Sequence, residues 1–239
     1  MGQSVSKDSD LHYFKGIMLE HEGNHEGALK ELNYALKINP NNPDYHYYKG
    51  LILVKLNLFE DAIEEFDEAI KLRPNDADYY CKKGETLHYL GRYEEALDEF
   101  EKAIKLESNE PYYRYYKGRI LVELELYEEA LNEYNEIIKR QPNVSVLHYE
   151  KGRVLIFLSK FEEALEEFDI ATKLKPDEAK YHFLKGVVLF YLGRCSEALE
   201  EINAALMYDP YKSEYLNLYK RIRFTCNDVA RNDFSINSL

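Results

Sequence analysis

Apolar residues recur along this chain at the three-to-four spacing of amphipathic helices. Two such runs follow one another in residues 43–76, the first made of Tyr45, Tyr48, Ile52 and Leu56 and the second of Phe59, Ile63, Phe66 and Ile70. Residues at this spacing share one face of an α-helix. Asn57 and Leu58 separate the two runs, so the pattern predicts two helices joined by a tight turn.

The same pattern returns every 34 residues. Each unit contains a Lys-Gly dipeptide, and the six glycines are Gly16, Gly50, Gly84, Gly118, Gly152 and Gly186. An alanine follows twelve residues after each glycine, at Ala28, Ala62, Ala96, Ala130, Ala164 and Ala198. A proline closes five of the six units, where it ends the second helix. A coincidence of several residue types at one fixed period is a strong sign of a repeat architecture.

These positions resemble the tetratricopeptide repeat family over residues 9–226. The resemblance implies an all-α, right-handed α-solenoid of six helix-turn-helix repeats plus a C-terminal capping helix. We expect the repeats at 9–42, 43–76, 77–110, 111–144, 145–178 and 179–212, and the capping helix at 213–226. A flexible arm at residues 1–8 and a polar tail at residues 227–239 are expected on either side.

In this family, the first helix of each repeat lines a concave surface. The corresponding stripe of this sequence is acidic in the first repeats, with Asp10, Asp44 and Asp78, and aromatic with two arginines in the later ones. Aromatic rings offer flat apolar contact, and arginine binds a carboxylate or phosphate bidentately. The residues predicted to contact a protein or peptide ligand are Tyr47, Glu85, Tyr112, Tyr115, Arg119, Tyr149, Arg153 and Phe183.

Two alternatives stay open for these residues. Arg119 has Glu123 and Arg153 has Glu150 at helical spacing, so that both arginines can form local ion pairs while the aromatic rings pack between repeats. The second alternative is a chaperone-associated module. Family members that bind chaperone C-termini use a clamp of lysine and asparagine side chains, of which only Lys180 is present here, so the resemblance does not extend to that function.

Charge and cysteine content restrict the partners and the location. The formal net charge of −13 disfavours nucleic acid as a partner. There is neither an apolar run of ~18 residues nor a secretory signal. The three cysteines, Cys81, Cys195 and Cys226, are odd in number and far apart, which favours free thiols in a reducing compartment. We therefore expect a cytoplasmic scaffold that is not an enzyme and needs no cofactor, and its oligomeric state is left open.

Histidines raise the question of a metal site. The segment from His21 to His25 reads HEGNH, as in zinc proteases, but that chemistry needs both histidines on one continuous helix. The inter-helix turn of the first repeat falls on Gly23 and Asn24, so no metal site is expected. Four histidines recur once per repeat, at His12, His46, His148 and His182, and are predicted to be packing residues. The lysine before each repeat glycine is expected to lay its stem on apolar surface and reach water.

The N-terminus carries a candidate modification signal. Met1-Gly2 followed by Ser6 and Lys7 fits the pattern for N-myristoylation at Gly2. One myristoyl chain binds a membrane only marginally, with a constant on the order of 10⁴ M⁻¹. Since no second lipid signal lies nearby, membrane association through this lipid is expected to be reversible or to depend on a bound partner.

Overall fold

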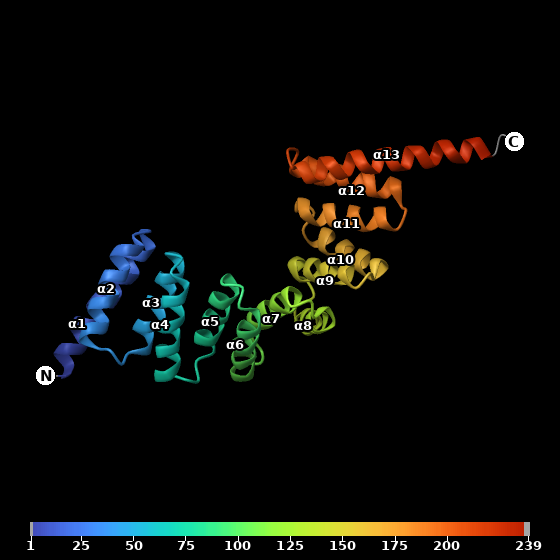
Figure 1. Ribbon diagram of the computed structural model, residues 1–239. Helices are drawn as coiled ribbons and strands as arrows, with labels where there is room; N and C mark the ends of the chain where they lie inside the picture. The colour runs from blue at the N-terminus through green and yellow to red at the C-terminus, as the bar shows by residue number, and fades with distance from the viewer. Residues whose placement is uncertain (1, 237–239) are drawn as a thin grey trace. The chain divides into compact units, whose positions relative to one another are not determined.

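The computed structural model describes residues 2–236, with side chains described for residues 7–226. Thirteen α-helices account for this part of the chain (Figure 1). Their bounds are α1 Gly2–His21, α2 His25–Ile38, α3 Pro43–Lys55, α4 Phe59–Leu72, α5 Ala77–Tyr89, α6 Tyr93–Leu106, α7 Pro111–Glu123, α8 Tyr127–Arg140, α9 Ser145–Phe157, α10 Phe161–Leu174, α11 Ala179–Tyr191, α12 Cys195–Tyr208 and α13 Ser213–Ile236.

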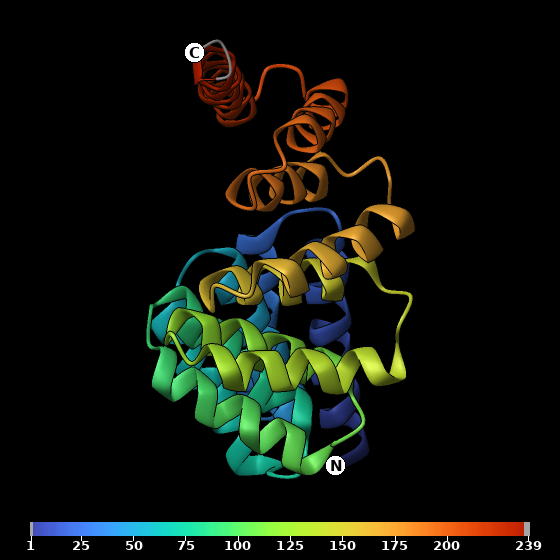
Figure 2. The same cartoon turned by 90° about the vertical axis from the view of Figure 1, so that its right-hand side faces the viewer.

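The helices form two compact units, Met1–Leu124 and Glu125–Leu239. Within each unit, consecutive helices pack side by side, α1 on α2 and α3 on α4 in the first, α9 on α10 and α11 on α12 in the second (Figures 1 and 2). The expected all-α array of sequential helix pairs, closed by a capping helix, is confirmed.

The repeated glycines and alanines lie where paired helices approach most closely. All six alanines of the second helices are completely buried. A Cβ atom added to Gly50 would lie 2.6 Å from Phe66 Cε1, and one added to Gly186 would lie 2.7 Å from Ile202 Cδ1. Real Cβ contacts are longer than this, so the first helix needs glycine here because a large second-helix side chain occupies the space.

Each helix pair is joined by a residue in the left-handed conformation. Glycine fills this place in three turns, and Gly91 has φ +71°. Asn57 and Ser159 adopt φ values of 60° and 58° without being glycine. In these turns the backbone N–H of the following residue donates a hydrogen bond to a carbonyl of the preceding helix. The Lys160 N–H, for example, donates to the Leu155 carbonyl at 2.9 Å. This bond satisfies a carbonyl that the helix end leaves open.

Both ends of the chain differ from the expectation. α1 begins at Gly2, so residues expected to form an arm are helical, and α13 continues past residue 226 to Ile236. Neither added segment contains a proline, so no residue of this type interrupts the helix. Ser9 is completely buried, and its Oγ lies 3.2 Å from the Tyr45 hydroxyl oxygen, which ties the first helix to the second repeat.

The prediction of three free thiols is wrong. Cys195 and Cys226 form a disulfide, with their Cα atoms 6.3 Å apart. Cys195 begins α12 and Cys226 lies in α13, so residues separated by 31 positions meet when α13 packs on the last repeat. Cys81 is free and buried, and burial raises the pKa of its thiol. The disulfide links the capping helix α13 to the last repeat. Free thiols therefore no longer support a reducing compartment for this protein.

Candidate functional site

The first helices of the N-terminal unit border a small apolar hollow. It has a volume of about 160 Å³ and is lined by Gly16, Ile17, Glu20, Leu32, Tyr48, Leu51, Ile52 and Lys55. Glu20 and Lys55 form an ion pair, and this contact lowers the pKa of Glu20. The hollow therefore offers an apolar floor whose charged lining residues are paired with each other.

The acidic stripe expected to face a ligand is used inside the array. Each of its three aspartates accepts a hydrogen bond from a tyrosine of the following repeat, in the pairs Asp10–Tyr45, Asp44–Tyr79 and Asp78–Tyr113. Asp44 also binds Arg73 at 2.8 and 3.0 Å, and this contact lowers the pKa of Asp44. These carboxylates join neighbouring repeats, so fewer of them are available to a ligand than the sequence suggests.

Two of the predicted contact residues of the N-terminal unit are held by neighbouring repeats. The Tyr47 ring packs 4.9 Å from the Tyr79 ring, and burial raises the pKa of Tyr47. Glu85 accepts hydrogen bonds from the Tyr112 hydroxyl and from Lys82, both at 2.8 Å. Tyr112 itself stays partly exposed.

α7 presents Tyr115 and Arg119. The Tyr115 ring lies 5.5 Å from the Tyr116 ring, and the Arg119 guanidinium lies 5.5 Å from the same ring. In the part of the chain that the structure describes, Arg119 does not form the ion pair with Glu123 that the sequence allows. Its guanidinium is held by stacking and keeps its hydrogen-bond donors.

In the C-terminal unit, Arg153 follows the structural alternative. Its guanidinium donates to Glu150 at 2.7 Å. The Tyr149 ring lies 4.9 Å from that of Tyr181, and the Phe183 ring lies 4.7 Å from that of Tyr215. Packing between successive first helices thus explains these aromatic positions, and their contact with a ligand stays a prediction.

A second hollow lies between α11 and α13, with a volume of about 260 Å³. It is lined by Phe183, Val187, Phe190, Tyr191, Glu214, Asn217, Leu218 and Arg221. The Arg221 guanidinium lies 5.6 Å from the Phe190 ring centre. The sequence interpretation missed the α13 residues because it treated this helix as a cap.

The repeat period contains the signal for these residues. Tyr215 follows Tyr181 by 34 residues, and Arg221 follows Arg153 by twice that interval. α13 therefore occupies the place of the first helix of a seventh repeat. Arg221 stands at the same repeat position as Arg119 and Arg153, so three arginines mark this position along the array.

The repeated histidines are not simple packing residues. His46, His148 and His182 each place Nδ1 2.6–2.7 Å from a glutamate and Nε2 2.8–2.9 Å from a proline carbonyl. Both partners are acceptors, so each ring satisfies them by donating from both nitrogens, which requires the protonated form. Hydrogen bonding raises the pKa of each of these histidines, although burial opposes it and is the largest single influence on His46.

The lysines that precede the repeat glycines join the same network. Lys49, Lys151 and Lys185 lie 2.5–2.6 Å from the glutamates that bind the histidines, namely Glu65, Glu167 and Glu201. They are therefore ion-paired between helices, which differs from the expectation that they reach water. The His21 and His25 rings are on different helices, α1 and α2, and no cluster of potential metal ligands occurs among the described residues.

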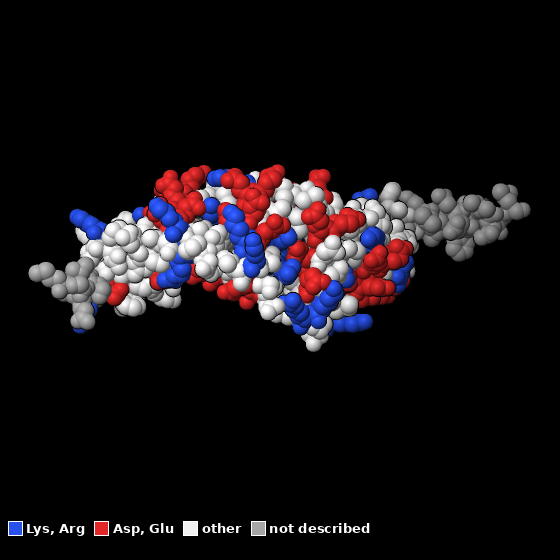
Figure 3. Space-filling view, turned by 90° about the horizontal axis from the view of Figure 1, so that it is seen from below, with Lys and Arg blue, Asp and Glu red and all other residues white. Residues whose placement is uncertain are grey.

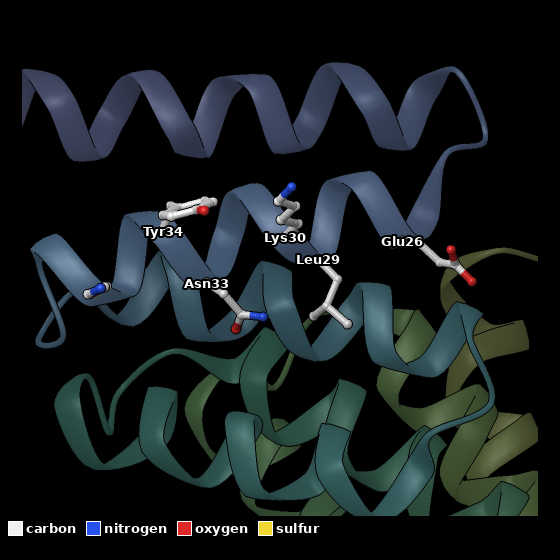
Figure 4. A pocket seen from close by; sticks show the side chains of 6 residues that line it. Glu26, Leu29, Lys30, Asn33 and Tyr34 are labelled. Carbon is white, nitrogen blue, oxygen red and sulfur yellow. The ribbon is translucent and has the colours of Figure 1, made fainter.

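Another depression lies on one face of α2, away from the first helices. It measures about 370 Å³ and is lined by Glu26, Leu29, Lys30, Asn33, Tyr34 and Lys37 (Figure 4). All six residues come from a single helix, and Figure 4 shows their side chains spread along it with no point of convergence. A specific small-molecule site needs convergent polar groups, which this surface lacks.

Sequential helix pairs that stack on one another within each unit define a helical-repeat scaffold. The chain belongs to the tetratricopeptide repeat family: one profile of the family, "TPR repeat", matches residues 21–57 and 50–90, and another, "Tetratricopeptide repeat", matches residues 81–145 and 149–213. Tetratricopeptide repeat proteins are non-catalytic scaffolds that bind peptides and proteins. None of the helices in the described part of the chain has the length and apolar character needed to cross a membrane.

Solved structures support this assignment. YrrB, described as a TPR protein with an unusual peptide-binding site, is 25% identical, with a TM-score of 0.67 over 79% of this chain and 97% of its own. MamA from Desulfovibrio magneticus RS-1 is 22% identical, with a TM-score of 0.68 over 72% and 97%. PilF from Pseudomonas aeruginosa is 18% identical, with a TM-score of 0.74 over 91% and 99%. The last two show the fold alone. No curated protein matches the sequence.

Proposed function

We propose that this protein is an adaptor that binds an extended peptide or protein segment on the concave surface of its repeats. The observation that carries the proposal is the hollow between α11 and α13, where Phe183 and Phe190 form an aromatic floor and Arg221 lies at its edge. An apolar ligand side chain fits the floor, and a neighbouring carboxylate fits the guanidinium. The peptide-binding site named for YrrB supports the same kind of ligand.

Arg119 and Arg221 are the arginines best suited to a ligand. Each stacks on an aromatic ring, Arg119 on Tyr116 and Arg221 on Phe190. Arg153 is already paired with Glu150, so a ligand carboxylate has to compete with that contact. We therefore rank Arg153, Tyr47 and Glu85 below Arg119, Arg221 and Tyr112 as ligand contacts.

A peptide selection tests the proposal. A displayed library of random linear peptides is selected on the full chain, and the affinity of the best peptide is measured by fluorescence anisotropy. We expect Arg221→Ala or Arg119→Ala to weaken binding about 10-fold, the effect of losing one charged hydrogen bond. The control is Arg92→Ala, because Arg92 lies in an inter-helix turn and pairs locally with Glu95. Failure to select any peptide, or equal loss in the control, contradicts the proposal.

The adaptor function includes a cytoplasmic location and reversible attachment to membranes through a myristoyl group on Gly2. The support is the sequence Met1-Gly2 with Ser6 and Lys7. The intact mass of the protein from its own cells tests the lipid. Loss of Met1 with the addition of a ~14-carbon acyl chain is expected, and Gly2→Ala is expected to lose it. An unacylated mass in the wild type contradicts the lipid.

A further inference from the structure

The first helix exposes an apolar stripe, and every later repeat buries two of its three positions. Leu11, Phe14 and Met18 of α1 are 53%, 59% and 63% exposed. They lie three and four residues apart, on one face of the helix. Adding the repeat period to Leu11 gives Tyr45, Tyr79, Tyr113, Leu147, Tyr181 and Tyr215, which are at most 5% exposed.

The equivalents of Met18 show the same contrast. They are Ile52, Thr86, Ile120, Val154, Val188 and Ile222, and none is more than 2% exposed. In those repeats the preceding helix pair covers this face, as α2 covers α3. No earlier helix of the described chain covers α1, so Leu11 and Met18 stay exposed at positions that later repeats bury.

Charged residues at the two ends of the stripe indicate which partner can bind it and in which direction. Lys7 lies one turn before Leu11, and Glu22 lies one turn after Met18, and both are exposed. The start of the stripe carries Lys7 next to the exposed Asp8, and its end carries Glu22 next to the exposed His21. A parallel copy of the helix would place like charges together. An antiparallel copy, centred between Phe14 and Lys15, places Lys7 opposite Glu22 and Leu11 opposite Met18.

We propose that α1 pairs with α1 of a second copy of this chain in an antiparallel, two-fold symmetric contact. The two Phe14 rings meet near the axis, and a Lys7–Glu22 pair closes each end. Such an isologous contact is self-complementary by construction. Figure 3 shows a largely uncharged surface at the N-terminal end of the N-terminal unit, in contrast to the acidic helices further along. A lipid surface fits less well, since Asp8 and Glu22 flank the stripe and the chain carries a net charge of −13.

The contact involves mainly one helix from each copy. It therefore falls at the lower end of specific interfaces, near or below about 1,200 Å² in total. Exchange between monomer and dimer is expected in the micromolar range, and self-association will depend on concentration.

Sedimentation equilibrium of the full chain, from about 1 μM to about 1 mM, tests the proposal. We expect the wild type to pass from monomer to dimer over this range. Phe14→Glu is expected to remain monomeric, because it places two carboxylates at the axis. The matched control is Met207→Glu, which alters another exposed apolar residue, on α12 and 71% exposed, and is expected to dimerise as the wild type does. Circular dichroism verifies that both variants keep their helices.

Charge reversal tests the antiparallel register. Lys7→Glu and Glu22→Lys each turn both end contacts into repulsions, and each is expected to weaken the dimer roughly 10-fold. The double variant restores opposite charges and is expected to recover most of the wild-type affinity. A double variant weaker than either single one overturns the register.

Other occupants give distinct results. A wild type that stays monomeric throughout overturns the proposal. The proposal is also overturned if the dimer persists in Phe14→Glu and is lost in Arg221→Ala, because the second copy then binds the surface that carries Arg221. Flotation with vesicles of anionic phospholipid gives the third result. If the protein is monomeric in solution and binds these vesicles, and if Phe14→Glu removes that binding, the stripe binds lipid. This result overturns the dimer.

Discussion

A histidine at position 80 should stabilise the third repeat, because that repeat lacks one part of a network found in the second, fifth and sixth repeats. In the second, fifth and sixth repeats a histidine bridges a glutamate of the second helix and a proline carbonyl. In the third, Tyr80 takes the histidine position and donates to the Pro74 carbonyl at 2.9 Å. Glu99 is buried and uses Oε1 for Lys83 and Lys102, while Oε2 has no partner in the described structure.

The magnitude is the balance between one new hydrogen bond and one weaker interaction that disappears. The substitution Tyr80→His keeps a donor for the Pro74 carbonyl and adds one aimed at Glu99 Oε2. A hydrogen bond to a charged group contributes about 1.5–3 kcal/mol. Removing the Tyr80 ring abolishes its cation–π interaction with the Lys102 ammonium at 6.0 Å, worth about 0.5–1 kcal/mol at an exposed site, and some apolar packing. We expect a net increase of about 1 kcal/mol in the free energy of unfolding.

The increase should depend on pH with a defined sign. His46, His148 and His182 have raised pKa values in the folded protein. A group with a raised folded pKa stabilises fully below its unfolded pKa, about 6.5 for histidine, and loses the effect as pH rises through the folded value. The paired Glu65, Glu167 and Glu201 have lowered pKa values, so their contribution is lost only in acid.

The assay is urea unfolding by circular dichroism at about pH 6 and about pH 8.5, with hydrogen exchange of α5 and α6 to locate the change. The stabilisation is expected at the lower pH and should shrink at the higher one. The control is Tyr80→Phe, which loses the bond to Pro74 and should destabilise equally at both values. If Tyr80→His shows no stabilisation at about pH 6, or the same change at both, the reasoning about Glu99 is refuted.

Three further changes test other features. Gly50→Ala should lower the free energy of unfolding by about 1–3 kcal/mol through overpacking, because the new Cβ meets the Phe66 ring. Adding Phe66→Leu to this variant should restore part of the stability, and an unchanged stability of Gly50→Ala contradicts the close approach. Ser159→Gly should raise the stability of the C-terminal unit by about 0.5–1 kcal/mol in urea unfolding, by relieving a left-handed non-glycine residue; a loss counts against this account. Cys226→Ser should lower that unit's stability by about 2–4 kcal/mol, and dithiothreitol should do the same to the wild type; an unchanged melting curve with reductant means that the disulfide does not form.

The contacts of the candidate ligand-binding residues were only partly predictable from the sequence. The repeat frame predicted which first-helix positions face a ligand, and Arg153 and Tyr149 do lie on the predicted helix. What each position does depends on its neighbour in the next repeat. Asp44 is taken up by Tyr79 and Arg73, and Tyr149 stacks on Tyr181. The sequence pattern of a single helix shows on which face a residue lies. It does not show whether a residue of an adjacent helix already contacts that side chain.

The amino-acid sequence by itself determined the helix pairs and their packing class. The 34-residue period of glycine, alanine and proline requires two short helices per repeat at close approach, because only small residues fit where backbones meet. The tertiary structure alone decided the Cys195–Cys226 bridge and the interhelical ion pairs of the histidines and lysines. These contacts join residues from different helices, and their partners are fixed by how the helices stack. The period placed each partner on its helix, and packing decided which of them meet.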